Sequence, residues 1–174
     1  MPIQIQTDRL LLREMTQADF PALCQMLYDP VVMKAYEGAF TQAEAQAWLD
    51  RQISRYRKDG LGLWAVALRE TGRMIGQCGL TWQEADGRTV LEVGYLFSQA
   101  YWHRGYATEA ARACRDFAFD TLGAKTVYSI IRDTNAASRA VALRNGMHRV
   151  GGFVKHYRGV EMPHDVFAVS APER

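Results

Sequence analysis

The chain has 174 residues, of which 48% are hydrophobic and 23% are charged, and its net charge is +2. These values are typical of a globular protein and exclude disordered and fibrous classes, and so small a charge gives no indication of a nucleic-acid partner. No apolar run is long enough to cross a bilayer and the N-terminus has no signal-peptide pattern, so we expect a cytoplasmic protein without a membrane partner. Cys24, Cys78 and Cys114 form no C-x-x-C pair, which predicts reduced thiols.

Apolar periodicity and turn residues predict eleven secondary-structure elements. A strand at 9–13 precedes a helix capped at Thr16 and a second helix that begins with the capping box at 41–44 and ends at Gly60. The remaining elements are strands at 63–68, 74–80 and 90–97, a helix from Gly105 to Leu122, a strand at 125–131, a helix at 135–145, and strands at 150–156 and 166–169.

The order β-α-α-β-β-β-α-β-α-β-β predicts an α/β fold with one mixed sheet. No repeat or linker interrupts the chain, so residues 1–174 are expected to form a single domain. The helix from Gly105 to Leu122 connects two parallel strands. Such connections are almost always right-handed, which places this helix against one face of the sheet. Its N-terminal turn then lies at the carboxyl edge of the strands, where α/β sheets usually bind ligands.

The turn at 102–108, which reads WHRGYAT, is the most informative segment of the sequence. Backbone N–H groups at a helix N-terminus lack intrahelical partners, and the helix dipole favours an anion there. Gly105 has no Cβ to press on a pyrophosphate, Ala107 keeps the next turn narrow, and Arg104 adds positive charge. The segment therefore predicts a site for a phosphorylated cofactor.

Glu92 is the only charged residue in the apolar strand at 90–97. Strand alternation puts it on the same face as Gly94, which leaves space beside the carboxylate. A buried carboxylate needs either partners or a cleft. Two interpretations stay open: a functional group in a cleft, or a structural carboxylate at a sheet edge or in an ion pair with Arg88 or Arg112.

Asn135 and Ser138 stand three residues apart at a predicted helix start, so they share one face. Either Thr134 or Asn135 would be an ordinary N-cap. Because this helix start lies beside the glycine turn at one edge of the sheet, we expect a cofactor to lie between the two.

Two residue classes are assigned mainly structural roles. No metal site is predicted, because no ligand spacing relates His103, His148, His156 and His164. Aromatic residues are expected mostly in the core, with a few lining a substrate cleft; these are Tyr36, Trp48, Tyr56, Trp64, Trp82, Tyr95 and Tyr101.

Taken together, these segments resemble the GNAT superfamily of N-acetyltransferases, and more narrowly its RimJ/RimL-like group. The resemblance covers nearly the whole chain, beginning with TDRLLLR at 7–13. Its most specific parts are EVGYLF at 92–97, YWHRGYATEA at 101–110, and Asn135-x-x-Ser138 followed by NGM at 145–147.

This resemblance implies a fold in which two central strands splay apart, with acetyl-CoA as cosubstrate. It implies that the pyrophosphate binds the backbone at 103–108, that pantetheine lies along 96–98 and bonds to Asn135, and that Ser138 lies near the sulfur. By residue, the expected cofactor contacts are Leu96, Phe97, Ser98, His103, Arg104, Gly105, Tyr106, Ala107, Thr108, Asn135 and Ser138.

We expect an amine to attack the acetyl carbonyl directly in a ternary complex. Glu92, through water, is the candidate base, because amines are protonated at neutral pH. Backbone N–H groups at 96–98 would hold the developing oxyanion. Ser138 would protonate or hydrogen-bond the leaving thiolate, since Ala142 stands where many superfamily members carry a tyrosine acid. Trp102 opens a turn that begins with Gln or Arg in the broader superfamily.

Other functions stay open on the sequence alone. One is an acyl-CoA-binding sensor or partner domain without turnover; a nucleotide site is the weaker alternative, because G-x-x-x-x-G-K-[ST] and G-x-G-x-x-G are missing. The acceptor of an enzyme could be a protein N-terminus, an amino acid, a polyamine or an aminoglycoside. Specificity is expected in the first two helices, the loop at 29–41 and the last strand pair. Both a monomer and a homodimer are compatible with the sequence.

Overall fold

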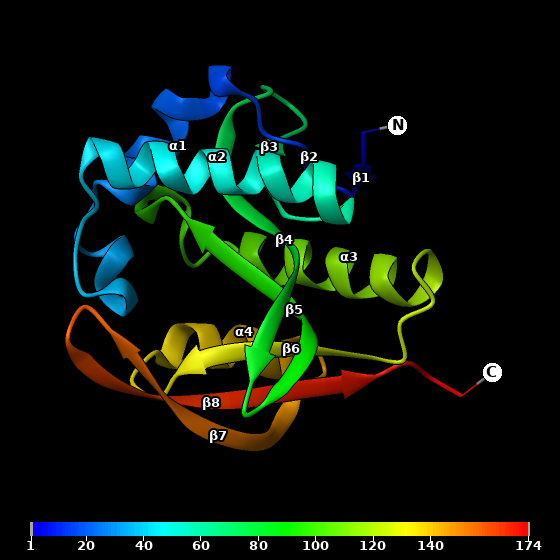
Figure 1. The fold of residues 1–174 in the computed structure, drawn as a ribbon. Helices are drawn as coiled ribbons and strands as arrows, with labels where there is room; N and C mark the ends of the chain where they lie inside the picture. Colours follow the sequence, from blue (N-terminus) through cyan, green and yellow to red (C-terminus); the bar gives the residue numbers. More distant parts are fainter. Residues whose placement is uncertain (1, 174) are drawn as a thin grey trace.

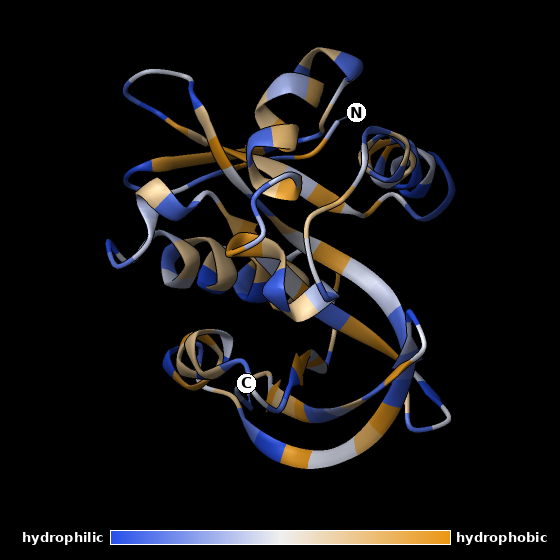
Figure 2. Ribbon diagram, turned by 90° about the vertical axis from the view of Figure 1, so that its left-hand side faces the viewer, coloured by the Kyte–Doolittle hydropathy of each residue, from blue (hydrophilic) through white to orange (hydrophobic). Residues whose placement is uncertain are grey.

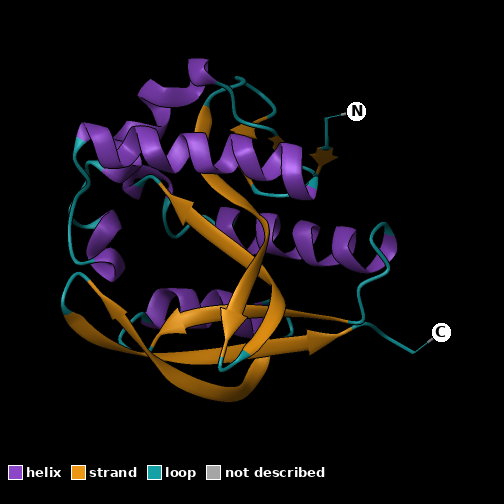
Figure 3. Cartoon of the chain, in the orientation of Figure 1, coloured by secondary structure: helices purple, strands orange, loops and turns teal. Residues whose placement is uncertain are grey.

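The computed structural model describes residues 2–173. Figures 1 and 3 show a sheet with helices on both of its faces. The strands are β1 (Gln4–Gln6), β2 (Leu10–Arg13), β3 (Leu63–Leu68), β4 (Met74–Ala85), β5 (Arg88–Phe97), β6 (Thr126–Arg132), β7 (His148–Tyr157) and β8 (Val160–Ser170); the α-helices are α1 (Phe20–Leu27), α2 (Gln42–Asp59), α3 (Tyr106–Asp120) and α4 (Ala136–Arg144).

Eight strands form one mixed sheet in the order β1-β2-β3-β4-β5-β6-β8-β7. The predicted α/β class and the predicted order of elements are confirmed, with β1 added at the N-terminus. Strand β1 has three residues and a single apolar side chain, Ile5, which is partly buried. So short a pattern cannot be recognised as a strand from the sequence. A 3-10 helix at Val32–Tyr36 was also not expected, and it fills part of the loop predicted at 29–41.

Strand β8 is much longer than the predicted segment 166–169. Pro163 and two polar residues after it interrupt the apolar pattern, so its N-terminal half does not read as a strand. Pro163 pairs with Val154 of β7 and lies beyond the last β6–β8 pair, Arg132 with His164. Its missing N–H therefore leaves no β6 carbonyl without a partner.

Helix α2 lies on the opposite side of the sheet from α3 and α4, as the two perpendicular views agree (Figures 1 and 2). Its N-terminus has the predicted capping box: the Glu44 amide donates to the Thr41 hydroxyl and the Thr41 amide to the Glu44 carboxylate. Gly60 ends it in the left-handed conformation, with φ 70°. The apolar face of this helix packs into the main core through Ala45, Trp48 and Leu49.

The two central parallel strands separate, as the resemblance implies. Strands β4 and β5 pair along ten positions, whereas β5 and β6 pair in register only at Glu92 with Tyr128. Beyond that pair the carboxyl end of β5 has no neighbour on its β6 side.

Within residues 2–173 no helix is long and apolar enough to cross a membrane. The three cysteines are buried and form no disulfide.

Candidate active site

A cavity of about 370 Å³ lies where β5 and β6 part. Its lining comes from both sides of the sheet: Arg55 belongs to α2, and Ser138 belongs to α4. Glu92 and Tyr95 of β5 also line it, and their side chains point to opposite faces of the strand because neighbouring positions alternate. The cavity therefore runs through the sheet, from the α2 side to the α4 side.

Glu92 lies at the point of separation. Its Oε2 accepts a hydrogen bond of 2.6 Å from the Ile130 amide of β6. One residue along, the Ser129 hydroxyl donates to the Val93 carbonyl at 2.8 Å. Side chains thus replace backbone pairing at the mouth of the gap, which explains how two adjacent parallel strands can diverge without leaving these buried groups unpaired.

The surroundings of Glu92 favour its neutral form. Burial raises the pKa of Glu92 to about 7, against the opposing effects of the Ile130 amide, Lys155 and Arg55. The side chain is only partly buried, however, and it borders the cavity. A carboxyl with a pKa near 7 can both accept and release a proton at physiological pH.

The alternative structural partners of Glu92 do not pair with it. Arg112 donates two hydrogen bonds to the Arg144 carbonyl and joins α3 to α4. No ion pair joins Glu92 to Arg88 or to any other cation in the described part of the chain. The cavity interpretation of Glu92 is the one that its geometry supports.

Asn135 and Ser138 lie together on the far side of the cavity. Asn135 is the N-cap of α4, and its Oδ1 accepts a hydrogen bond from the Ser138 amide at 3.1 Å. The capping role considered from the sequence is therefore present, and the Asn135 Nδ2 group has no partner among residues 2–173. Tyr95 donates from its hydroxyl to the Ser138 carbonyl at 2.7 Å, which fixes the first turn of α4 against β5.

The glycine turn has the geometry of an anion site. Gly105 is the N-cap of α3 in the left-handed conformation, with φ 79°, and His103 also has a positive φ of 62°. The first amide to enter the helical pattern is that of Glu109, which donates to the Gly105 carbonyl. The amides of residues 103–108 have no partner within residues 2–173, so six consecutive N–H groups are free at a helix N-terminus.

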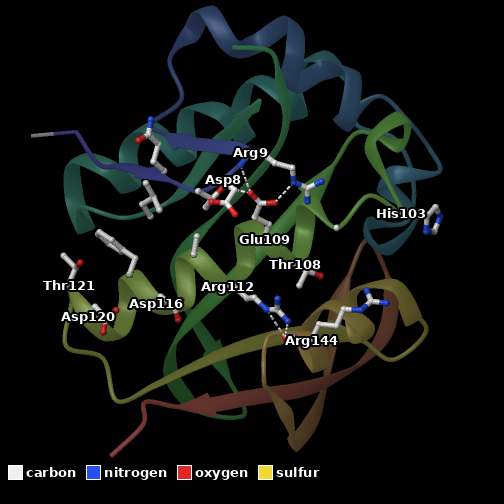
Figure 4. A pocket seen from close by; sticks show the side chains of 16 residues that line it. Asp8, Arg9, His103, Thr108, Glu109, Arg112, Asp116, Asp120, Thr121 and Arg144 are labelled. Carbon is white, nitrogen blue, oxygen red and sulfur yellow. Dashed lines mark hydrogen bonds and ion pairs between the residues drawn. The ribbon is translucent and has the colours of Figure 1, made fainter. Parts of the chain in front are cut away.

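An N-terminal segment holds this turn in place. Glu109, in the first turn of α3, accepts hydrogen bonds from the Thr7 hydroxyl at 2.6 Å and from the Arg9 amide and Nε at 2.9 and 2.7 Å. Arg9 also donates to the Arg104 carbonyl and lies 4.3 Å from the centre of the Tyr106 ring. Figure 4 shows Arg9 and Glu109 facing one another above α3. The segment Thr7-Asp8-Arg9 is thus a clamp on the glycine turn.

A second, more open cavity of about 1090 Å³ runs along α3 (Figure 4). Its lining includes Gly105, Thr108 and Arg112 but neither Glu92 nor Ser138. The larger cavity therefore adjoins the glycine turn, whereas the smaller one holds the acid and the groups at the strand gap.

The three residues expected along pantetheine differ in what their backbones offer. The Ser98 amide donates to the Ile75 carbonyl of the chain segment next to β5, so it is not free to hold an oxyanion. Because antiparallel pairing alternates, Leu96 also turns its amide towards β4 and Phe97 turns its amide towards the gap. This corrects the expectation that N–H groups throughout 96–98 face the acetyl group.

Two departures from the superfamily pattern have a structural explanation. Trp102 donates from its indole nitrogen to the Phe97 carbonyl at 2.9 Å, which ties the glycine turn to the end of β5. Ala142 is 1% exposed and packs in the core. A tyrosine there would overfill that core. Tyr95 of β5 instead contacts this helix, by the hydrogen bond from its hydroxyl to the Ser138 carbonyl.

Several cavity residues carry no recognisable motif. Tyr36 and Trp48 pack edge to face, with ring centres 5.5 Å apart, and line the cavity on the α2 side. Arg51, Arg55 and Lys155 line it as well. Only the helical spacing of the two arginines, four residues apart, could have indicated that they share a face. Lys155 belongs to β7 and reaches the cavity through pairing that no local pattern encodes.

Comparison with known proteins identifies the family. Residues 9–148 match the family model described as an acetyltransferase (GNAT) domain. An uncharacterised protein of Bacillus subtilis, YkkB, is 36% identical over 146 residues, 83% of this chain and 85% of that protein. The uncharacterised N-acetyltransferase YnaD of the same organism is 30% identical over 154 residues, 88% of this chain and 87% of that protein.

Among solved structures, a RimL described as a ribosomal L7/L12 α-N-protein acetyltransferase in complex with coenzyme A superposes with a TM-score of 0.77. It is 18% identical and covers 97% of this chain and 98% of its own, so the likeness is one of fold. The chain belongs to the GNAT acetyltransferase family. It is an acetyltransferase, and enzymes of this fold use acetyl-CoA.

Proposed function

We propose that this enzyme transfers an acetyl group from acetyl-CoA to a primary amine by direct attack within a ternary complex. The observation that carries the proposal is the cavity through the sheet, which Glu92 borders on the α2 side and Ser138 on the α4 side. An amine on one side and a thioester on the other would meet in the strand gap. Holding two reactants together in this way can supply a large part of the rate enhancement.

The residues of the glycine turn suit a pyrophosphate. Their six free amides would donate hydrogen bonds to its oxygens, and Gly105 presents no side chain to it. We assign cosubstrate binding to His103, Arg104, Gly105, Tyr106, Ala107 and Thr108, with pantetheine along Leu96, Phe97 and Ser98 and a hydrogen bond from the free amide of Asn135. When bound, acetyl-CoA supplies the thioester.

Glu92 is the proposed proton acceptor. An acceptor amine is mostly protonated at neutral pH, so it must lose a proton before it attacks. Glu92 takes this proton, directly or through water, and its pKa of about 7 suits the role. As the C–N bond forms and the C–S bond breaks, the second amine proton passes to the sulfur, which leaves as the thiol with a hydrogen bond from the Ser138 hydroxyl.

The Phe97 amide is the proposed donor to the acetyl carbonyl oxygen. It faces the gap between the strands, whereas the Ser98 amide is occupied by the Ile75 carbonyl. A fixed N–H group aimed at the oxygen stabilises the negative charge that develops there. The acceptor is a protein N-terminus or a small-molecule amine; the RimL neighbour is named for the first of these, but at 18% identity it is evidence for the fold and not for the acceptor.

Ligand-induced stabilisation tests cosubstrate binding. Acetyl-CoA or CoA at a hundredfold excess over its Kd should raise the free energy of unfolding by about 2.7 kcal/mol. Gly105→Trp should abolish this gain. Gly123→Trp is the matched control, because Gly123 lies just beyond the C-terminus of α3 with a similar φ of 68° and has open space around it. Thiol release with an amine panel then tests turnover; stabilisation without release from any amine would favour a sensor domain.

A further inference from the structure

The cavity has an unbalanced set of charges. Within residues 2–173, its lining contains the cations Arg51, Arg55, Arg132 and Lys155 but only one carboxylate, Glu92. An excess of positive charge in a partly enclosed site raises the local concentration of anions and repels cations. In the proposed function the acceptor occupies this cavity. The charge of the lining therefore bears on whether the acceptor is anionic or cationic.

Three of these cations have no carboxylate within ion-pair distance in the described chain. Arg55 donates only a long hydrogen bond of 3.3 Å to the Gln52 side chain, and Arg51 and Lys155 are in none of the ion pairs. Many exposed lysines and arginines elsewhere in residues 2–173 are likewise in no ion pair, so lack of pairing alone does not distinguish these three. What distinguishes Arg51, Arg55 and Lys155 is that they border one partly enclosed cavity whose described lining has a single carboxylate.

The arrangement of Arg51 and Arg55 is unfavourable for the free protein. They stand four residues apart on α2, where like charges repel one another and destabilise a helix. Burial, and then the charge of Arg51, lowers the pKa of Arg55, although Asp59, Glu92 and Tyr36 act in the opposite direction. A bound anion would relieve both the burial cost and the repulsion, so the site is electrostatically incomplete without one.

Lys155 faces this pair from the other wall. It lies on β7, and both it and Arg55 are near enough to Glu92 to lower the pKa of that carboxyl. Arg132, next to them in the cavity, pairs with Glu37 at 2.5 Å yet leaves its buried Nε without a hydrogen-bond partner. Donors from α2, β6 and β7 therefore surround one space beside Glu92.

We propose that the acceptor is a small amine that also carries an anionic group, a carboxylate or a phosphate, which Arg55 and Lys155 hold while the amine lies at Glu92. This inference rests on the proposed function and names its substrate class. A volume of about 370 Å³ suits a small molecule. The same cations repel polyamines and aminoglycosides, which removes two of the four acceptor classes that the sequence left open.

Matched acceptor pairs test the proposal. The rate of CoA release is measured for O-phosphoethanolamine against ethanolamine, and for α-amino acids against their own amides. The anionic member should have a kcat/KM about tenfold or more higher, because hydrogen bonds to charged groups are the strong ones. Arg55→Gln and Lys155→Gln should each remove most of this preference. Arg57→Gln, an exposed position on the same helix outside the cavity lining, should keep it.

Each outcome decides the proposal. Equal or better use of the neutral amines, or the same preference in all three variants, overturns it and leaves the acetyltransferase function intact. Faster acetylation of a peptide with an acidic N-terminus than of every small anionic amine also overturns it. If no amine releases CoA, the proposed turnover fails, and calorimetry on CoA-loaded protein then decides the question of binding. Tighter binding of the anionic amine than of its neutral partner, lost in Arg55→Gln, supports the proposal. Equal binding of the two amines overturns it.

Discussion

The Glu92 carboxylate accepts a hydrogen bond from the Ile130 amide at the place where β5 and β6 cease to pair. One side chain thereby joins two properties of the site. It satisfies a backbone group that the strand separation would leave unpaired, and it brings a carboxyl of raised pKa to the resulting gap. The ion pair with Arg88 or Arg112 that the sequence left open is not formed, and the structural role that Glu92 does have, accepting from the Ile130 amide, is compatible with a chemical role in the cavity.

The first prediction concerns the pH dependence of stability. The pKa of Glu92 is raised from 4.5 to about 7 on folding, so between these values the folded state holds a proton that the unfolded state has lost. This group therefore lowers stability as the pH rises from 4.5 to 7, and the full cost is present above 7. Glu92→Gln, which keeps an acceptor for the Ile130 amide, should raise Tm at pH 8 and have little effect at pH 4.5. An equal change at both pH values would show that the raised pKa is wrong.

The second prediction concerns the clamp on the glycine turn. Glu109→Gln removes the charge that holds Thr7 and Arg9, so KM for acetyl-CoA should rise severalfold while KM for the amine changes little. Asp116→Asn is the matched control, since it breaks an exposed ion pair with Arg115 elsewhere on α3. If the two variants bind acetyl-CoA alike, the clamp does not order the turn.

The clamp also has a pH signature. The pKa of Glu109 is lowered: burial raises it, but the hydrogen bonds from Thr7 and Arg9 and the charge of Arg9 outweigh that effect. Its contribution to stability is therefore present above the unfolded pKa of 4.5 and is lost as the pH falls through the folded value. The affinity of the wild-type protein for CoA should weaken over the same acidic pH range. Measuring the Kd for CoA as a function of pH checks this, and a Kd that does not change over this range would show that the clamp has no role in binding.

The third prediction separates Tyr95 from Ser138. Tyr95→Phe removes the hydroxyl that ties the Ser138 carbonyl, and with it the first turn of α4, to β5, so it should cost about 1 kcal/mol of stability as well as lowering kcat. Ser138→Ala removes only a hydroxyl, so kcat should fall with Tm nearly unchanged. Urea denaturation and steady-state kinetics on the two variants check this. A large loss of stability in Ser138→Ala would assign its hydroxyl a structural function.

The fourth prediction concerns packing beneath the site. A Cβ on Gly79 would lie 2.0 Å from the Gly62 carbonyl oxygen, a backbone atom that cannot move freely. Gly79→Ala should therefore destabilise the protein by about 3 kcal/mol or more. Gly151→Ala, in a strand with open space around the same position, should be nearly neutral. Similar urea midpoints for the two variants would contradict the close approach of β4 to the segment before β3.

Much of the fold could be predicted because its signals are local. The capping box at Thr41, the glycine at 105 and the alternating strands need only neighbouring residues to be recognised. The length of β8 could not be predicted, since its polar N-terminal half becomes a strand only through pairing with β7. For the same reason, Lys155 and the arginines of α2 could not be placed in one cavity: their proximity is a property of the assembled sheet and helices.

The candidate site divides in the same way. Gly105, Asn135 and Ser138 stand in short motifs with fixed spacing, so sequence alone marks them. That the Phe97 amide is free could not be predicted in this way, because it depends on which residues of β5 turn their amides towards β4. Pairing register between strands decides that, and apolar alternation along one strand does not reveal it.

The pH dependence of kcat/KM is the most direct test of Glu92 as the proton acceptor. With an amine acceptor identified by the panel, the wild-type enzyme should lose kcat/KM tenfold per pH unit below a pKa of about 7, the value for Glu92. Glu92→Gln should be slower and should lack this limb. An unchanged limb in Glu92→Gln would show that another group accepts the proton and that Glu92 serves only to hold the strands apart.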